Sequence, residues 1–137
     1  MIGAGILSLV CFAAVMLLHM HALRLARATS ERLSAPWDRH AGLLIVLISH
    51  LLVAGVFALG LFVGESGGLG GFEKERTDGW MDYYYFALIT VTTVGLGDIY
   101  PTGHLRFVTG VASLTGFILI SCTAQYVFQL MSKQEDA

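Results

Sequence analysis

The chain has 137 residues, of which 55% are hydrophobic and only 13% are charged, and its formal net charge is −2. Because a soluble domain carries roughly 25% charged residues, this composition excludes a conventional water-soluble enzyme and a disordered chain. The weak negative charge also excludes a basic surface for nucleic acid. The mean hydropathy of +0.71 therefore predicts a non-enzymatic membrane protein. Its two cysteines, Cys11 and Cys122, lie in apolar runs, which is typical of small buried hydrophobic side chains.

Three apolar stretches are long enough to cross a bilayer. A hydrocarbon core about 30 Å thick requires roughly 20 helical residues. The stretches cover residues 2–20, 41–64 and 107–132, and only His50 interrupts the second. The first has no basic region before it and its arginines follow it, so we interpret it as a mature helix and not as a cleavable signal.

A fourth apolar segment, residues 83–97, lies between the second and third stretches and is too short to span the membrane. Asp82 and Asp98 bracket it. Because unpaired amides in hydrocarbon cost several kcal/mol each, irregular backbone at this depth must be shielded by protein or line a watery cavity. The segment is therefore predicted to be a re-entrant pore loop.

The charged loops predict the orientation of the chain. Residues 24–40 carry four arginines against two acidic residues, whereas residues 65–82 carry two basic residues against five acidic ones. Since cytoplasmic loops are enriched in arginine and lysine, the first loop is predicted to face the cytoplasm. The N-terminus and residues 65–82 would then lie outside, and a short tail, residues 132–137, inside.

One short motif gives the prediction its specificity. Residues 92–98 read TTVGLGD and are followed by Ile99, Tyr100 and Pro101. This motif resembles the selectivity filter of potassium channels, usually written TTVGYGD, with Leu96 where tyrosine is commonest. The resemblance extends over about residues 41–131 and is strongest from Thr90 to Pro101. A glycine turn between two strands is the alternative interpretation, and the position of the motif between two spanning helices argues against it.

The resemblance implies an all-α membrane protein with three transmembrane helices, a re-entrant pore helix and a filter loop, assembled as a homotetramer in the lipid bilayer. Its implied parts are an additional N-terminal helix (1–23), a cytoplasmic linker (24–40) and a pore domain (41–131). The pore domain would consist of an outer helix (41–64), a turret (65–79), a pore helix (80–92), the filter (93–98) and an inner helix (105–131).

In this family, carbonyl oxygens from four chains replace the water around a potassium ion. The corresponding ligands here would be the carbonyls of Thr93, Val94, Gly95, Leu96 and Gly97 and the hydroxyl of Thr93. Both glycines can adopt the positive φ angles that such a strand needs. Val94 is expected to turn its side chain into the surrounding protein. Potassium is thus the implied permeant ion, and no cofactor is expected.

Residues on either side of the filter are predicted to support it. Asp78 or Gly79 would cap the pore helix, whose negative C-terminal dipole end favours a cation. Asp98 would add charge at the outer mouth. Tyr85 and Phe86 occupy positions where aromatic residues buttress the filter in relatives, and Tyr85 is expected to bond Asp98. Ile89 stands where some relatives place a glutamate, so a buried carboxyl pair behind the filter is not expected.

The third stretch resembles an inner helix with a gate. Gly116 would be a hinge, and Phe128 would form a hydrophobic constriction near the cytoplasmic end. Helical spacing brings the predicted cavity-facing residues onto one side: Phe117, Ile120, Ala124 and Phe128. The alternative interpretation is that this stripe packs against the second helix. Ala112 and Gly116 also form a pair of small residues suited to close helix contact. The first two helices lack the regular arginines of a voltage sensor.

The histidines differ in their surroundings. His104 follows the filter closely, which makes it a candidate for sensing external protons. His50 lies within a membrane helix, where we favour a neutral imidazole bonded to a neighbouring helix over a functional role. His19 and His21 are two residues apart and so face different directions, which argues against a metal pair.

The resulting interpretation is a potassium-selective channel of the cell's inner membrane that conducts passively. A non-selective monovalent cation channel is the nearest alternative, because Leu96 cannot make the hydroxyl bond of the usual tyrosine. A subunit of a potassium uptake transporter is a further alternative, although such proteins usually carry four filter repeats in one chain. A non-conducting regulatory membrane protein with a decayed pore is the last.

Overall fold

The computed structural model describes residues 1–33, 37–73 and 79–132. Within these ranges the chain forms four helices and one pair of two-residue strands. In chain order the elements are α1 (Ile2–Arg32), α2 (Trp37–Ser66), β1 (Phe72–Glu73), α3 (Trp80–Val91), β2 (Tyr100–Pro101) and α4 (Leu105–Ser132).

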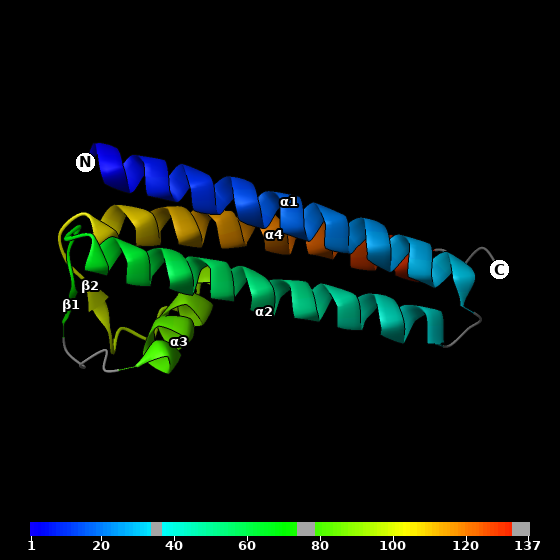
Figure 1. Ribbon diagram of the computed structural model, residues 1–137. Coiled ribbons are helices and arrows are strands. Elements are labelled where there is room, and N and C mark those ends of the chain that lie inside the picture. The colour runs from blue at the N-terminus through cyan, green and yellow to red at the C-terminus, as the bar shows by residue number, and fades with distance from the viewer. Residues whose placement is uncertain (34–36, 74–78, 133–137) are drawn as a thin grey trace.

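The three long helices α1, α2 and α4 run side by side, with α2 antiparallel to both α1 and α4 (Figure 1). Each is long and apolar enough to cross a membrane. The N-terminus lies at the same end of the bundle as β1 and β2, and the C-terminus lies at the opposite end (Figure 1). Helix α3 has 12 residues and is therefore only about 18 Å long, which is too short to span. The arrangement is that of a multi-pass membrane protein.

The segment predicted to be a cytoplasmic linker, residues 24–40, is mostly helical in the part that the structure describes. Helix α1 continues to Arg32, where Leu33 takes an extended conformation, and α2 already begins at Trp37. The arginines that mark the end of the apolar stretch are good helix formers, so a change in polarity does not end the helix. The membrane-spanning parts are thus shorter than the helices that contain them.

Helix α1 packs on the bundle through one narrow face. Its buried residues recur every three or four positions and are mostly small: Ala4, Ser8, Cys11, Val15, His19, Leu23 and Ala26. Small side chains let the helix axes approach closely. A β-carbon at Gly60 of α2 would lie 2.6 Å from the Sγ atom of Cys11. Cys11 is buried as predicted, whereas Cys122 is only half-buried.

The main core lies where α2, α3 and α4 meet. Its largest fully buried side chains include Phe57 and Leu61 of α2 and Leu105 and Leu119 of α4. Phe86 of α3 is also buried there. The outer faces of the long helices carry exposed leucines, isoleucines and phenylalanines, as expected for side chains in contact with lipid. This core fixes α3 on the inner surfaces of α2 and α4.

Candidate functional site

Helix α3 occupies the predicted range of residues 80–92 to within one residue. Gly79 is its N-cap, and the backbone amide of Gly79 donates a 3.2 Å hydrogen bond to Oδ2 of Asp82. Asp78, the other predicted cap, lies outside the described residues. At the other end Thr92 is the C-cap, and its amide donates to the carbonyl of Leu88.

The C-terminal end of α3 is seated against the middle of α4. A β-carbon at Gly116 would overlap the carbonyl oxygen of Val91, so only glycine permits this contact. Gly116 follows Leu105 by 11 positions, or roughly 17 Å of helix. Ala112 is also fully buried on this face, consistent with the predicted close contact at the pair of small residues. The segment after α3 therefore starts about half-way along the bundle and returns to the end where β2 lies.

The returning segment alternates in backbone handedness. Thr93, Gly95 and Gly97 have φ angles of 61°, 52° and 76°, and neither Val94 nor Leu96 has a positive φ. Both glycines thus take the conformation predicted for them. Thr93 was not predicted to do so, and it is the only non-glycine residue with positive φ in the described parts of the chain. Such alternation gathers the amides on one side of the strand and leaves the carbonyls on the other.

The hydrogen bonds of this segment involve its amides and not its carbonyls. The amides of Val94 and Gly95 both donate to the carbonyl of Ile89, at 3.0 and 3.1 Å. The carbonyls of Thr93, Val94, Gly95 and Leu96 accept no hydrogen bond from any residue that the structure describes. Four consecutive oxygens are thus available to a ligand. They follow directly on the C-terminus of α3, which carries the negative end of the helix dipole.

The side chains of this segment are not packed by their own chain. Val94 and Leu96 are 60% and 64% exposed. The expectation that Val94 is buried in surrounding protein therefore does not hold within one chain. Thr93, Gly95 and Gly97 line a cavity of about 430 Å³ between α3 and α4, together with Phe86 and other residues.

The hydrogen bond predicted between Tyr85 and Asp98 is present. The hydroxyl of Tyr85 donates to Oδ2 of Asp98 at 2.5 Å, and the amide of Ile99 donates to Oδ1 of Asp98 at 3.0 Å. Helix α3 thereby supports the returning segment at both ends. The second predicted support, Phe86, is buried and packs edge-on against Phe72, with ring centroids 5.2 Å apart.

Three supporting contacts were not predicted. The hydroxyl of Tyr83 donates to Oε2 of Glu65 and so ties α3 to the end of α2. The hydroxyl of Tyr100 lies 3.3 Å from where a β-carbon at Gly97 would be. Gly71 and Thr102 are joined through their backbones and through the Thr102 hydroxyl. The pairs Glu65–Tyr83 and Gly71–Thr102 are 18 and 31 positions apart, and no periodic pattern connects their members.

On α4, the predicted cavity-facing stripe is exposed. Phe117, Ile120 and Phe128 are 63%, 40% and 67% exposed, and Ala124 is exposed as well. The buried residues of α4 lie on another face and include Leu119. The alternative interpretation, in which the stripe packs against the second helix of its own chain, is therefore wrong.

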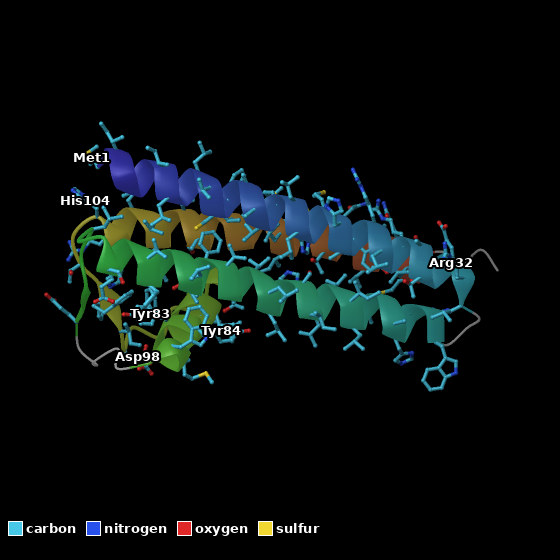
Figure 2. All side chains as sticks on the ribbon, in the orientation of Figure 1. Met1, Arg32, Tyr83, Tyr84, Asp98 and His104 are labelled. Carbon is cyan, nitrogen blue, oxygen red and sulfur yellow. The ribbon has the colours of Figure 1, made fainter. Side chains whose placement is uncertain are left out.

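His104 lies away from the returning segment in its own chain. It lines a cavity with Met1, Ala4 and Phe107, and its amide donates to the carbonyl of Leu69. Figure 2 shows His104 beside Met1, with Asp98 at the far side of the bundle end. A direct contact between His104 and Asp98 of one chain is thus absent.

Comparison with known proteins agrees with this geometry. Residues 43–133, about two thirds of the chain, match the model of a protein family described as Ion channel. No curated protein and no solved structure matched the chain. The matched region contains α3, the returning segment and α4, and nearly all of α2, whereas α1 lies outside it. Members of such a family transport ions and are not enzymes. The chain therefore belongs to the ion channel family.

Proposed function

We propose that four copies of this chain form a potassium-selective channel that conducts passively. The observation that carries the proposal is the set of four consecutive carbonyls, Thr93 to Leu96, without a hydrogen-bond donor among the described residues. Backbone carbonyls that replace the hydration shell are the known means of selecting potassium. Gly97 and the hydroxyl of Thr93 would complete the set of ligands, and Asp98 would place negative charge at the outer mouth.

Four chains are needed for the carbonyls of residues 93–96 to surround an ion. One chain supplies one row of oxygens, and an ion without its water needs oxygens on all sides. Exposed backbone carbonyls cannot face lipid, since unsatisfied polar groups in hydrocarbon cost several kcal/mol each. Four chains around a fourfold axis would enclose the segment and cover the exposed side chains of Val94 and Leu96. Helix α3 would then be the re-entrant pore helix.

The orientation proposed from the loops fits the bundle. The end that carries the N-terminus, β1 and β2 would face outward, and the connection between α1 and α2 would lie in the cytoplasm of a cell whose inner membrane holds the channel. Arg24, Arg27 and Arg32 lie towards the C-terminal end of α1. Their positive charge favours this end on the cytoplasmic side. Phe128, exposed near the end of α4, is proposed as the inner constriction, with Gly116 as its hinge.

Reconstitution tests the proposal. Purified protein in detergent is expected to elute from a size-exclusion column with the mass of a tetramer, as measured by light scattering. After reconstitution into liposomes, it is expected to pass potassium down its gradient, and barium should block this flux. Liposomes carrying a Gly95→Ala, Gly97→Ala double variant serve as the control. A monomeric or dimeric protein without flux would contradict the proposal.

A non-selective cation channel is the second candidate, and Leu96 is the observation that favours it. Its side chain is 64% exposed and has no hydroxyl with which to fix the width of the filter. Reversal potentials with potassium and sodium on opposite sides of the membrane separate the two candidates. We expect a clear preference for potassium, whereas equal permeability of the two ions would establish the non-selective channel.

A further inference from the structure

A cavity of about 560 Å³ lies between α1 and α4, apart from the proposed filter. Its volume falls in the range of roughly 300–1,000 Å³ that is typical of small-molecule sites. One face of each helix lines it: Met20, Leu23, Arg24 and Arg27 of α1, and Ser121, Cys122 and Gln125 of α4. Helix α1 lies outside the region that matches the ion channel family. The family match therefore does not account for this cavity.

Two arginines give the cavity its charge. Arg24 and Arg27 are both exposed, and neither forms an ion pair or a hydrogen bond with any residue that the structure describes. Glu31, one turn after Arg27, is the single acidic residue of α1, and α4 has none. Glu31 is exposed and likewise forms no ion pair within the described ranges. The cavity thus carries two positive charges without a counterion among the described residues.

Helix α4 adds one hydrogen-bond donor on the facing side. The Ser121 hydroxyl donates its hydrogen within α4, to the carbonyl of Phe117 at 2.8 Å. The side-chain amide of Gln125 is exposed and bonds to none of the described residues, so its two N–H groups are available. Guanidinium groups bind phosphate oxygens in pairs, and an amide can donate to a further oxygen. The donors of this cavity therefore suit a phosphate group.

The cavity changes from apolar to polar along the helix axes. On α1, Met20 and Leu23 come one turn before the two arginines. On α4, the half-buried Cys122 comes about one turn before Gln125. Both helices run in the same direction, so the apolar side chains lie towards the middle of the bundle and the polar groups towards its C-terminal end (Figure 1). A phospholipid has the same order, with a phosphate above apolar acyl chains, whereas a soluble anion has no apolar part.

The polar end of the cavity lies at the depth of lipid headgroups. Arg24 follows Ile2, the first residue of α1, by 22 positions or about 33 Å of helix. The hydrocarbon core of a bilayer is about 30 Å thick, and long arginine side chains extend from its edge towards the headgroups. In the proposed orientation this edge is the cytoplasmic one, where basic pockets between membrane helices bind anionic headgroups.

We propose that the cavity binds one anionic phospholipid of the cytoplasmic leaflet, with the lipid phosphate held by Arg24, Arg27 and Gln125. A zwitterionic lipid would bring its own ammonium group close to the same two arginines, so a headgroup with a net negative charge is favoured. The bound lipid would join α1 to α4. It would thereby connect the additional N-terminal helix to the helix that carries the proposed gate.

General attraction between basic residues and an anionic membrane surface is the alternative, and Arg32 distinguishes the two. Arg32 lies at the end of the same helix (Figure 2) and is exposed, but it does not line the cavity. Under general attraction, Arg32 would contribute as much as Arg24 or Arg27. Arg32→Gln is therefore the matched control for the removal of charge.

Native mass spectrometry of the full-length protein in detergent tests the proposal. Phosphatidylglycerol is expected to stay bound at one lipid per chain, whereas phosphatidylcholine with the same acyl chains should be lost. The double variant Arg24→Gln, Arg27→Gln should retain phosphatidylglycerol about tenfold less, because each basic residue near an anionic headgroup strengthens binding several-fold. Arg32→Gln should behave like the wild type. Equal retention of the two lipids, or an equal loss in Arg32→Gln, would overturn the proposal.

The thiol of Cys122 reports whether the lipid lies in this cavity, and its labelling can be measured on the wild-type chain. Cys122 is half-buried and lines the cavity, whereas Cys11 is buried and serves as the internal control. Phosphatidylglycerol is expected to slow the labelling of Cys122 by N-ethylmaleimide several-fold, and phosphatidylcholine and glycerol 3-phosphate are not. Protection by glycerol 3-phosphate would identify a site for soluble anions, and unchanged labelling would place the lipid elsewhere. Either result would overturn the proposal.

An effect of the lipid on conduction rests on the proposed function. Gln125 comes one turn before Phe128, the proposed inner constriction. Potassium flux in liposomes is therefore expected to change several-fold with phosphatidylglycerol content in the wild type but not in the double arginine variant. An equal response of the two proteins would contradict this coupling. Absence of flux together with intact lipid retention and Cys122 protection would reject the channel and support the lipid site.

Discussion

The carbonyl oxygen of Val91 and the α-carbon of Gly116 approach so closely that a β-carbon at position 116 would overlap the oxygen. This contact seats the end of α3 on α4 and sets the depth from which the TTVGLGD segment returns. It also gives Gly116 a packing role in addition to the proposed role as a hinge.

Replacement of Gly116 by alanine is expected to destabilise the protein, because the added methyl group must displace backbone atoms of α3. Overpacking of this kind costs about 1–3 kcal/mol per chain. Gly110→Ala on the same helix is the control, since a β-carbon there meets nothing within 4 Å. Thermal unfolding in detergent should show a lower midpoint for Gly116→Ala alone. If Gly116→Ala unfolds like the wild type and alters only channel opening, the hinge is the sole role of this residue.

Gly95→Ala is expected to abolish selective flux through a change in backbone preference. Gly95 has a φ of 52° and open space around its α-carbon, so the cost is conformational, about 1–2 kcal/mol per chain. Gly68→Ala is a matched control, because Gly68 has a φ of 73° and equally open surroundings but lies in a turn after α2. Both variants should lose similar stability in denaturation. Retained potassium selectivity in Gly95→Ala would contradict the proposed filter.

Tyr85→Phe removes the hydroxyl that bonds Asp98 and should loosen the outer end of the returning segment. A hydrogen bond to a charged group contributes about 1.5–3 kcal/mol. In Tyr84→Phe, the control, the lost bond is a neutral one from the Tyr84 hydroxyl to the carbonyl of Leu51, at 3.0 Å. Bi-ionic potentials should show a lower ratio of potassium to sodium permeability in Tyr85→Phe only. Equal permeability ratios in Tyr85→Phe and Tyr84→Phe would show that the Tyr85 hydroxyl does not support the filter.

Phe128→Ala is expected to raise potassium flux several-fold by widening the proposed cytoplasmic constriction, where apolar rings would exclude water. Phe107→Ala, which truncates a similarly exposed ring at the opposite end of α4, should leave flux near the wild-type level. Stopped-flow flux measurements in liposomes compare the two. An unchanged flux rate in Phe128→Ala would show that Phe128 does not form the constriction.

The parts that the sequence predicted well depend on neighbouring residues. The limits of α3 follow from Gly79 and the short apolar run, and the positive φ of Gly95 and Gly97 follows from a motif in which each glycine has a fixed place. The hydrogen bond between Tyr85 and Asp98 joins residues 13 positions apart, and its prediction came from the resemblance of the motif to a potassium-channel filter. His50 does contact neighbouring helices, through Thr123 and the ring of His19.

What was missed depends on how the helices pack. His19 and Thr123 are 104 positions apart, and their contact exists only because particular faces of α1 and α4 meet. Tyr83 and Glu65 likewise come together through the angle of α3 against α2. The positive φ of Thr93 has no local cause, because threonine disfavours this region. The helix limits at Arg32 and Trp37 were missed because polarity marks the membrane boundary and not the end of a helix.

Gly71 and Thr102 stand 31 positions apart, and their three hydrogen bonds close a narrow neck at the point where the chain leaves α2 and comes back to α4. The stretch between them, which includes α3 and the carbonyls of Thr93 to Leu96, is also fastened to α2 by the Tyr83 and Tyr84 hydroxyls and to α4 at Gly116. Grafting this stretch onto another pair of antiparallel membrane helices would therefore require the neck, the partners of both tyrosines and the glycine that receives the end of α3.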